Sequence, residues 1–187
     1  MIQVAILASG TGSNAKSLIE HFSRNSEIEI TAVGTNRKTA GVLEIAKNFG
    51  VETFHFSKAQ MAEGELLAKL NSLNIDWILL SGFLLKIPLD IIEAFDNRIL
   101  NIHPSLLPKH AGKGMYGMNI HNSVFESDDD KSGMTIHKVT EDYDEGDVVF
   151  QVQVDISQCE SAEEIASKVL ALEHHYYPRI AEAMIND

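Results

Sequence analysis

The chain has 187 residues, of which 44% are hydrophobic and 22% charged, a composition typical of folded globular domains rather than disordered chains. Its 15 Lys and Arg against 27 Asp and Glu give a net charge of −12, so most of the surface would repel a nucleic-acid backbone. The single cysteine, Cys159, excludes an intramolecular disulfide. The sequence has neither a basic signal-peptide region nor an apolar run near the roughly 20 residues that span a bilayer. We therefore predict one cytoplasmic domain over residues 1–187, with neither nucleic acid nor a membrane as partner.

Short apolar runs alternate with amphipathic segments over the first part of the chain. The runs are rich in β-branched or aromatic residues and predict strands at 4–7, 28–33, 51–56, 77–80 and 99–102. Apolar residues at three- and four-residue spacing predict helices over 14–22, 41–49, 59–73 and 88–94. This alternation is typical of an α/β fold with a doubly wound, mainly parallel, Rossmann-like sheet covered by helices on both faces.

The pattern changes after residue 102, where a Pro- and Gly-rich loop precedes a short helix-like segment and an acidic tip at 128–130. Alternating residues predict two further strands at 134–139 and 148–154, on either side of an acidic loop at 140–146. Ser161 and Glu164 form the pattern of a capping box and predict a last helix that ends near Met184. We expect a phosphate-binding half at 1–100 and a catalytic half at 101–187.

A glycine-rich turn joins the first predicted strand to the first predicted helix. It consists of Gly10, Thr11, Gly12, Ser13 and Asn14. Backbone amides of such a turn approach a phosphate at the positive end of the helix. A dinucleotide site would need an acidic residue about 20 positions further on, which is not evident, and no Gly-Lys-Ser or Gly-Lys-Thr follows as in a Walker A motif. We therefore predict a monophosphate site; the alternative is a plain turn with a serine N-cap.

Asn101 and His103 stand two positions apart at the end of the fifth predicted strand. Alternation along an extended segment places both on one side, so an amide donor and an imidazole would act on one small group. Asp144, in the acidic loop, would raise the basicity of that imidazole. A lone histidine is more often structural and an acidic loop more often solvated, but the flanking prolines and Asn101 favour a site. Zinc-protease and serine-esterase motifs are absent from the sequence.

These motifs resemble the phosphoribosylglycinamide formyltransferases, a folate-dependent family, over essentially the whole chain. The resemblance rests on the turn at 10–14, the Ser-Gly-Phe turn at 81–83, the block Asn-Ile-His-Pro-Ser-Leu-Leu-Pro at 101–108, and Asp144 before Gly146. It implies transfer of the formyl group of 10-formyltetrahydrofolate to the amine of 5′-phosphoribosylglycinamide, in purine biosynthesis and without a metal ion. It leaves open whether the enzyme is a monomer or a homodimer.

The resemblance also implies roles for single residues. The catalytic residues would be Asn101, His103 and Asp144. The substrate phosphate and ribose would be held by Gly10, Thr11, Gly12, Ser13, Asn14 and Glu173. The folate would contact Leu84, Leu85, Lys86, Ile87, Asn101, Thr140, Glu141, Asp142, Tyr143 and Asp144. Because both substrates are anionic and the protein is acidic, we expect a local positive island at the glycine-rich turn.

The sequence departs from the family pattern in three places. Leu84 and Leu85 replace a common Met-Arg pair, a folate-contacting Arg has no clear counterpart beyond nearby Lys58, and the loop at 109–121 is longer. Formyltetrahydrofolate deformylases and methionyl-tRNA formyltransferases carry an additional domain, for which we expect no room in 187 residues. Sugar-nucleotide formyltransferases and a catalytically silent module on the same fold remain the alternatives.

Overall fold

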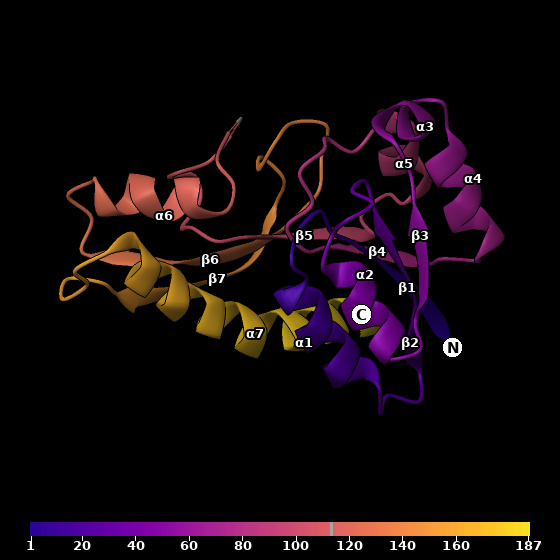
Figure 1. Ribbon diagram of the computed structural model, residues 1–187, viewed down its shortest axis with the longest axis horizontal. Helices are drawn as coiled ribbons and strands as arrows, with labels where there is room; N and C mark the ends of the chain where they lie inside the picture. The colour runs from indigo at the N-terminus through magenta and orange to yellow at the C-terminus, as the bar shows by residue number, and fades with distance from the viewer. Residues whose placement is uncertain (113) are drawn as a thin grey trace.

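Strands and helices alternate through the first two-thirds of the chain in a computed structural model that describes residues 1–112 and 114–187 (Figure 1). The strands are β1 (Ile2–Leu7), β2 (Ile28–Thr35), β3 (Glu52–His55), β4 (Trp77–Leu80), β5 (Ile99–His103), β6 (Lys131–Lys138) and β7 (Val148–Asp155). The helices are α1 (Ser13–Phe22), α2 (Val42–Asn48), α3 (Lys58–Ala62), α4 (Glu65–Ser72), α5 (Leu89–Ala94), α6 (Met118–Phe125) and α7 (Ala162–Asn186). The predicted α/β class is confirmed.

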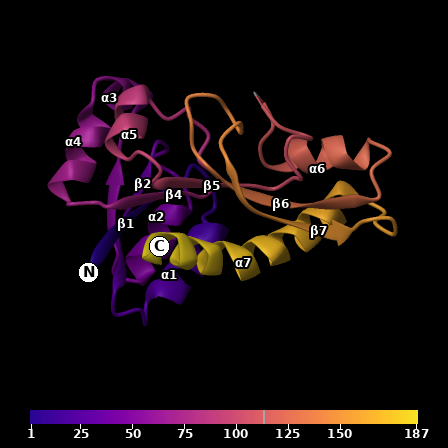
Figure 2. The same ribbon diagram turned by 180° about the vertical axis from the view of Figure 1, so that it is seen from behind.

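The strands form one sheet in the order β3-β2-β1-β4-β5-β6-β7. Strands β1 to β5 pair in parallel, whereas β6 pairs antiparallel with both β5 and β7. The order reverses between β1 and β4, and ligands of open α/β sheets bind in the crevice at such a point. In both views α7 extends along one side of the sheet from β7 to α1 (Figure 2). The predicted parallel sheet with C-terminal strands and a helix is therefore confirmed.

Strand β1 shows why helices cover both faces of the sheet, because its residues alternate between two apolar cores. Val4 and Ile6 belong to the core formed with α1, α2 and α7. Ala5 and Leu7 belong to the core formed with α3, α4 and α5. All four side chains are fully buried, and burial of each large one contributes about 1.5–3 kcal/mol. A strand buried on both faces reads as a continuous apolar run, as this one does.

The single helix predicted over 59–73 is wrong, because the segment folds as α3 and α4. Gly64 separates the two helices at φ 83, a left-handed conformation that glycine adopts without steric cost. Helix α3 begins with a capping box in which Ser57 and Gln60 exchange hydrogen bonds. The helical spacing of the apolar residues continued across Gly64 and concealed the break.

Helix α7 begins as predicted, with the Ser161 hydroxyl accepting a hydrogen bond from the Glu164 amide at 3.2 Å. The Glu164 carboxylate, however, accepts from the Glu160 amide at 2.9 Å, so the capping box is not the reciprocal one that the sequence predicts. Pro178 lies inside the helix and has no N–H for the carbonyl of His174, one turn earlier. The Ser17 hydroxyl of α1 donates to that carbonyl at 3.0 Å, which compensates for the missing bond.

Within residues 1–112 and 114–187, no helix combines the length and the apolar character needed to cross a bilayer.

Candidate active site

The carboxyl ends of β1, β4 and β5 open into a cavity of about 1110 Å3. Its wall includes most residues that the sequence predicts for the site, namely Gly10, Thr11, Asn14, Leu84, Leu85, Lys86, Ile87, Asn101, His103, Thr140, Glu141, Asp142, Tyr143, Asp144 and Glu173. Gly12 and Ser13 do not line it. The structure therefore brings segments from both halves of the chain to one side of the sheet.

The glycine-rich turn leads directly from β1 into α1. Gly12 is the N-cap at φ 88, so the serine N-cap of the alternative interpretation is wrong. A Cβ on Gly12 would lie 2.7 Å from Val42 of α2, which leaves no room for a side chain. No side chain caps α1, so the amides of its first turn keep their capacity to bind an anion.

Ser9 holds three segments of the cavity together, a role that the sequence analysis missed. Its hydroxyl donates to Asn36 Oδ1 at 2.6 Å and accepts from the Leu84 amide at 3.0 Å. Its own amide donates to the Gly82 carbonyl at 3.1 Å. Ser9 thereby fixes the predicted folate segment relative to the glycine-rich turn; its position beside that turn was the available signal.

Glu173 of α7 reaches the glycine-rich turn from the opposite end of the sequence. Asn14 Nδ2 donates to Glu173 Oε2 at 3.0 Å, while Asn14 Oδ1 is buried without a partner among the described residues. Burial raises the pKa of Glu173 to about 7, and the Asn14 hydrogen bond opposes this only in part. A buried acceptor and a protonatable carboxyl at the cavity wall together suit hydroxyl groups of a ligand.

Asn101 and His103 both line the cavity, as the alternation of β5 predicts. His137 lies opposite Asn101 in the antiparallel ladder with β6. The backbone carbonyl of Lys138 lies 2.8 Å from His137 Nδ1, and because a carbonyl only accepts, Nδ1 carries the proton. In the neutral ring His137 Nε2 then accepts from Asn101 Nδ2 at 3.0 Å. This contact orients the Asn101 amide and leaves its second N–H free; no sequence motif pointed to His137.

Asp144 lies between the two imidazoles. Its Oδ1 is 3.5 Å from His103 Nδ1 and 3.6 Å from His137 Nε2, and its Oδ2 accepts from the Gly112 amide at 3.2 Å. Although burial opposes ionisation, the imidazoles of His137 and His103 and the Gly112 amide keep the pKa of Asp144 below its usual value. Burial lowers the pKa of His103, and the Asp144 charge opposes this shift. The segment that the sequence predicts as a loop at 109–121 thus supports the carboxylate through Gly112, and its last four residues form the first turn of α6.

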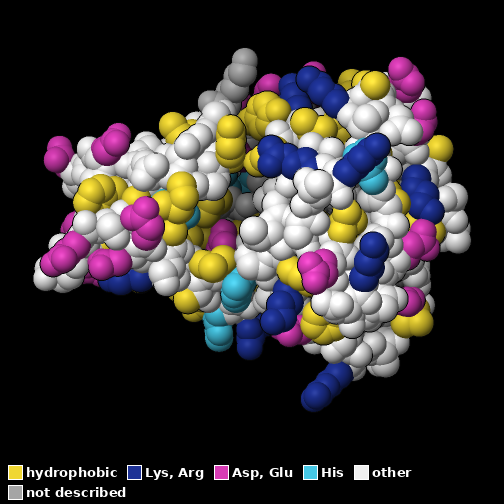
Figure 3. Space-filling view, viewed as in Figure 1, with side chains coloured by type: hydrophobic (Ala, Val, Ile, Leu, Met, Phe, Trp, Pro, Cys, Tyr) yellow, Lys and Arg dark blue, Asp and Glu magenta, His cyan; other side chains and the backbone are white. Residues whose placement is uncertain are grey.

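The two predicted folate segments meet across the cavity. Lys86 Nζ lies 3.9 Å from Asp142 Oδ1, and both side chains are largely exposed, so this contact adds little stability. Arg37 and Lys58 also line the cavity, and Lys113 lies outside the described residues. Dark-blue Lys and Arg side chains lie mainly over the right half of the molecule, beside the hollow that divides it (Figure 3). The cations of the described wall are accompanied by carboxylates, so the expected positive island is mixed in charge.

A family model described as formyl transferase matches residues 2–181, which is nearly the whole chain. The chain belongs to the formyl transferase family.

Named formyl transferases resemble this chain along its length. Phosphoribosylglycinamide formyltransferase of Escherichia coli is 30% identical over 96% of this chain and 85% of its own length. The chloroplastic enzyme of Vigna unguiculata is 38% identical over 99% of this chain, which spans only 61% of that relative. The enzyme from Brucella melitensis, whose crystal structure is known, is 34% identical in sequence. Its structure superposes with a TM-score of 0.87 over 98% of this chain and 95% of its own. These likenesses agree with the folate-dependent formyltransferase predicted from the sequence motifs.

The cavity wall also contains residues that the sequence analysis did not single out. Besides Ser9 and His137, they include His121 of α6, whose buried Nδ1 has no partner in the described structure. Among the described residues, no group of three or more His, Cys, Asp or Glu side chains is arranged to hold a metal ion.

Proposed function

We propose that the chain transfers the formyl group of 10-formyltetrahydrofolate to the primary amine of 5′-phosphoribosylglycinamide, as a step of purine biosynthesis. The observation that carries this proposal is the convergence of Asn101, His103 and Asp144 at the end of β5, within one cavity that also contains the glycine-rich turn and Glu173. One cavity therefore offers an anion site, a hydroxyl site and a hydrogen-bond donor.

The cavity wall suits the two substrates in different regions. The phosphate would bind at the amino end of α1, and the ribose hydroxyls would donate to Asn14 Oδ1 and bond with Glu173. The folate would lie against Leu84, Leu85, Lys86 and Ile87 and against residues 140–144. This arrangement would place the glycinamide amine and the formyl carbon beside Asn101 and His103.

The reaction requires charge stabilisation and a proton transfer. When the amine attacks the formyl carbon, negative charge develops on the formyl oxygen, which the free N–H of Asn101 would stabilise by a hydrogen bond and a protonated His103 by its positive charge. Asp144 would hold the imidazolium through Nδ1, since the two atoms lie 3.5 Å apart. The proton lost by the attacking amine would pass by way of this pair to the departing folate nitrogen.

The decisive experiment mixes the purified protein with formylated folate and phosphoribosylglycinamide and follows tetrahydrofolate release by absorbance. Release that requires the amine supports the proposal. Release without the amine identifies a deformylase, and none under either condition identifies a silent module.

Substitution of Asn101 and His103 tests whether these two residues are catalytic. We expect Asn101→Ala and His103→Ala each to lower kcat by about 10²- to 10³-fold, because the first removes a hydrogen-bond donor and the second a positive charge that stabilise the developing negative charge. Binding of phosphoribosylglycinamide, measured by calorimetry, should remain close to wild type because its phosphate site is separate. Wild-type rates in both variants would refute the assignment.

We also propose a cytoplasmic location and either a monomeric or a homodimeric state. Fractionation of cells that express the full protein, and light scattering of the purified protein, test these two points.

A further inference from the structure

The catalytic imidazole proposed above is held by the backbone of a second histidine. His103 Nε2 lies 2.9 Å from the carbonyl oxygen of His110, seven residues further along the chain. Because a carbonyl only accepts, Nε2 carries the proton, and in the neutral ring Nδ1 is the bare nitrogen facing Asp144. The His103 side chain is only 5% exposed, so water cannot readily replace this carbonyl.

The backbone of His110 needs support from its surroundings. His110 adopts φ 52, a left-handed conformation that is uncommon for residues other than glycine and persists where the surroundings hold it. Its ring supplies two anchors: Nδ1 lies 2.8 Å from Ser123 Oγ of α6, and Nε2 lies 3.1 Å from Asp129 Oδ2. The side chain is 14% exposed, which shields both contacts from water.

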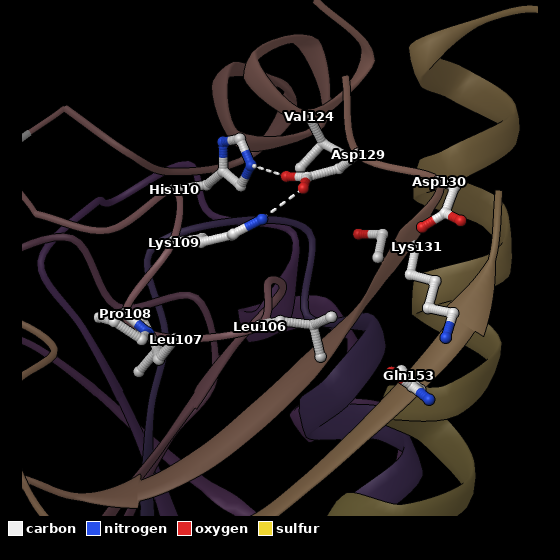
Figure 4. A pocket seen from close by; sticks show the side chains of 11 residues that line it. Leu106, Leu107, Pro108, Lys109, His110, Val124, Asp129, Asp130, Lys131 and Gln153 are labelled. Atoms are coloured by element: carbon white, nitrogen blue, oxygen red, sulfur yellow. Dashed lines mark hydrogen bonds and ion pairs between the residues drawn. The ribbon is translucent and has the colours of Figure 1, made fainter. Parts of the chain in front are cut away.

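Asp129 in turn is held by Lys109, whose ammonium group bonds its other carboxylate oxygen. The ring of His110 and the ammonium group of Lys109 converge on the carboxylate, with Val124 beside them (Figure 4). Hydrogen bonds from Lys109 and His110 lower the pKa of Asp129 to about 2, so the anchor is ionised at any physiological pH. The acidic tip at 128–130 therefore contains one residue with a defined partner in the loop that follows β5.

We propose that His110, clamped by Asp129 and Ser123, is a positioning residue that sets the tautomer and orientation of the His103 imidazole. The clamp acts through the His110 carbonyl and does not itself touch substrate, because neither His110 nor Asp129 lines the large cavity. This inference rests on the proposed function, since His103 matters only if it takes part in formyl transfer.

Four variants distinguish the effect of the side-chain contacts of His110 from the effect of its strained backbone conformation. His110→Gly relieves the left-handed conformation but removes both anchors, whereas His110→Gln retains an N–H that reaches toward Asp129. Asp129→Ala removes the main anchor and leaves His110 in place. Asp128→Ala is the matched control, because it removes the same charge from the same exposed turn without a contact to His110.

The loss of the clamp should lower turnover and leave substrate binding unchanged. We expect His110→Gly and Asp129→Ala to lower kcat by about 10- to 100-fold with KM for both substrates unchanged, because a misplaced reacting group slows chemistry to this degree. His110→Gln should recover much of the loss, and Asp128→Ala should match wild type. If Gly at position 110 preserves kcat, strain relief alone suffices and the clamp has no function.

Nitrogen NMR of the His103 ring gives a readout independent of turnover. Wild type should show a single neutral tautomer protonated at Nε2, whereas His110→Gly and Asp129→Ala should show a mixture and a shifted titration midpoint. The groups that face His103 and contribute to this titration are Asp144, His137, His110 and His121. Unchanged spectra in both variants overturn the inference even if the wild type transfers formyl groups. Changed spectra in a protein without formyl transfer would refute the proposed function and leave the clamp standing.

Discussion

Glu173 should make the protein less stable as the pH rises, and Glu173→Gln should remove this dependence. Glu173 is 6% exposed, and burial raises the pKa of its carboxyl from 4.5 to about 7. Below pH 4.5 it is protonated in both the folded and the unfolded chain. Between pH 4.5 and about 7 only the unfolded chain releases the proton, so the free energy of unfolding falls as pH rises through this window and levels off above it.

The size of the effect follows from the shift. One pKa unit corresponds to about 1.4 kcal/mol, so the full cost above pH 7 is about 3 kcal/mol, of which less than 1 kcal/mol is already present at pH 5. Glutamine has nearly the same shape, does not titrate, and offers Asn14 an oxygen acceptor. We therefore expect the variant to gain about 2–3 kcal/mol more over wild type at pH 8 than at pH 5.

Urea unfolding at pH 5 and pH 8 measures this difference, provided that the slope with denaturant is the same in both proteins. Glu44→Gln on the exposed side of α2 is the matched control, because it makes the same substitution on a helix without a buried carboxyl. An equal gain for Glu173→Gln at both pH values would show that the carboxyl does not titrate in the folded protein as its burial requires.

Three further changes test the site and the fold. Asp144→Asn should lower the His103 pKa further, because the carboxylate that opposes the effect of burial is lost. The alkaline limb of the pH profile of kcat should therefore move to lower pH, and an unmoved limb would contradict this. Gly12→Ala should destabilise the fold by at least about 1 kcal/mol in thermal unfolding, since φ 88 is strained for alanine and the new Cβ meets Val42 at 2.7 Å. Tyr177→Phe should cost about 1–3 kcal/mol, because two buried carbonyls lose their shared hydroxyl donor, and a neutral result would mean that they find other partners.

Features that depend on local sequence were predictable. The alternation of β5 placed Asn101 and His103 on one side of the strand, and the structure places both in the cavity wall. The short apolar run at 4–7 predicted a strand, and the structure buries that part of β1 on both faces. In each case the relevant spacing lies within a few residues of the chain, where the period of a strand decides which side chains share a side.

Features that depend on distant pairing were not predictable from the residues alone. His137 reaches Asn101 because β6 pairs antiparallel with β5 in one register, and a slip by one residue would turn its side chain to the other face. The raised pKa of Glu173 requires the packing of α7 on α1. The residue of α1 that Glu173 contacts, Asn14, lies 159 positions earlier in the sequence. Sequence spacing carries no information on either contact.

The ladder between β5 and β6 also determines where the chain can tolerate insertions. Its register, Asn101 with His137 and His103 with Thr135, is set by main-chain hydrogen bonds and not by the length of the segment that joins the two strands. Insertions in that segment that leave the contacts of His110, Gly112, Ser123 and Asp129 intact can therefore accumulate or disappear while the pairing of β5 with β6 stays constant. The rest of the segment can then change the shape of the cavity entrance without moving Asn101 or His103.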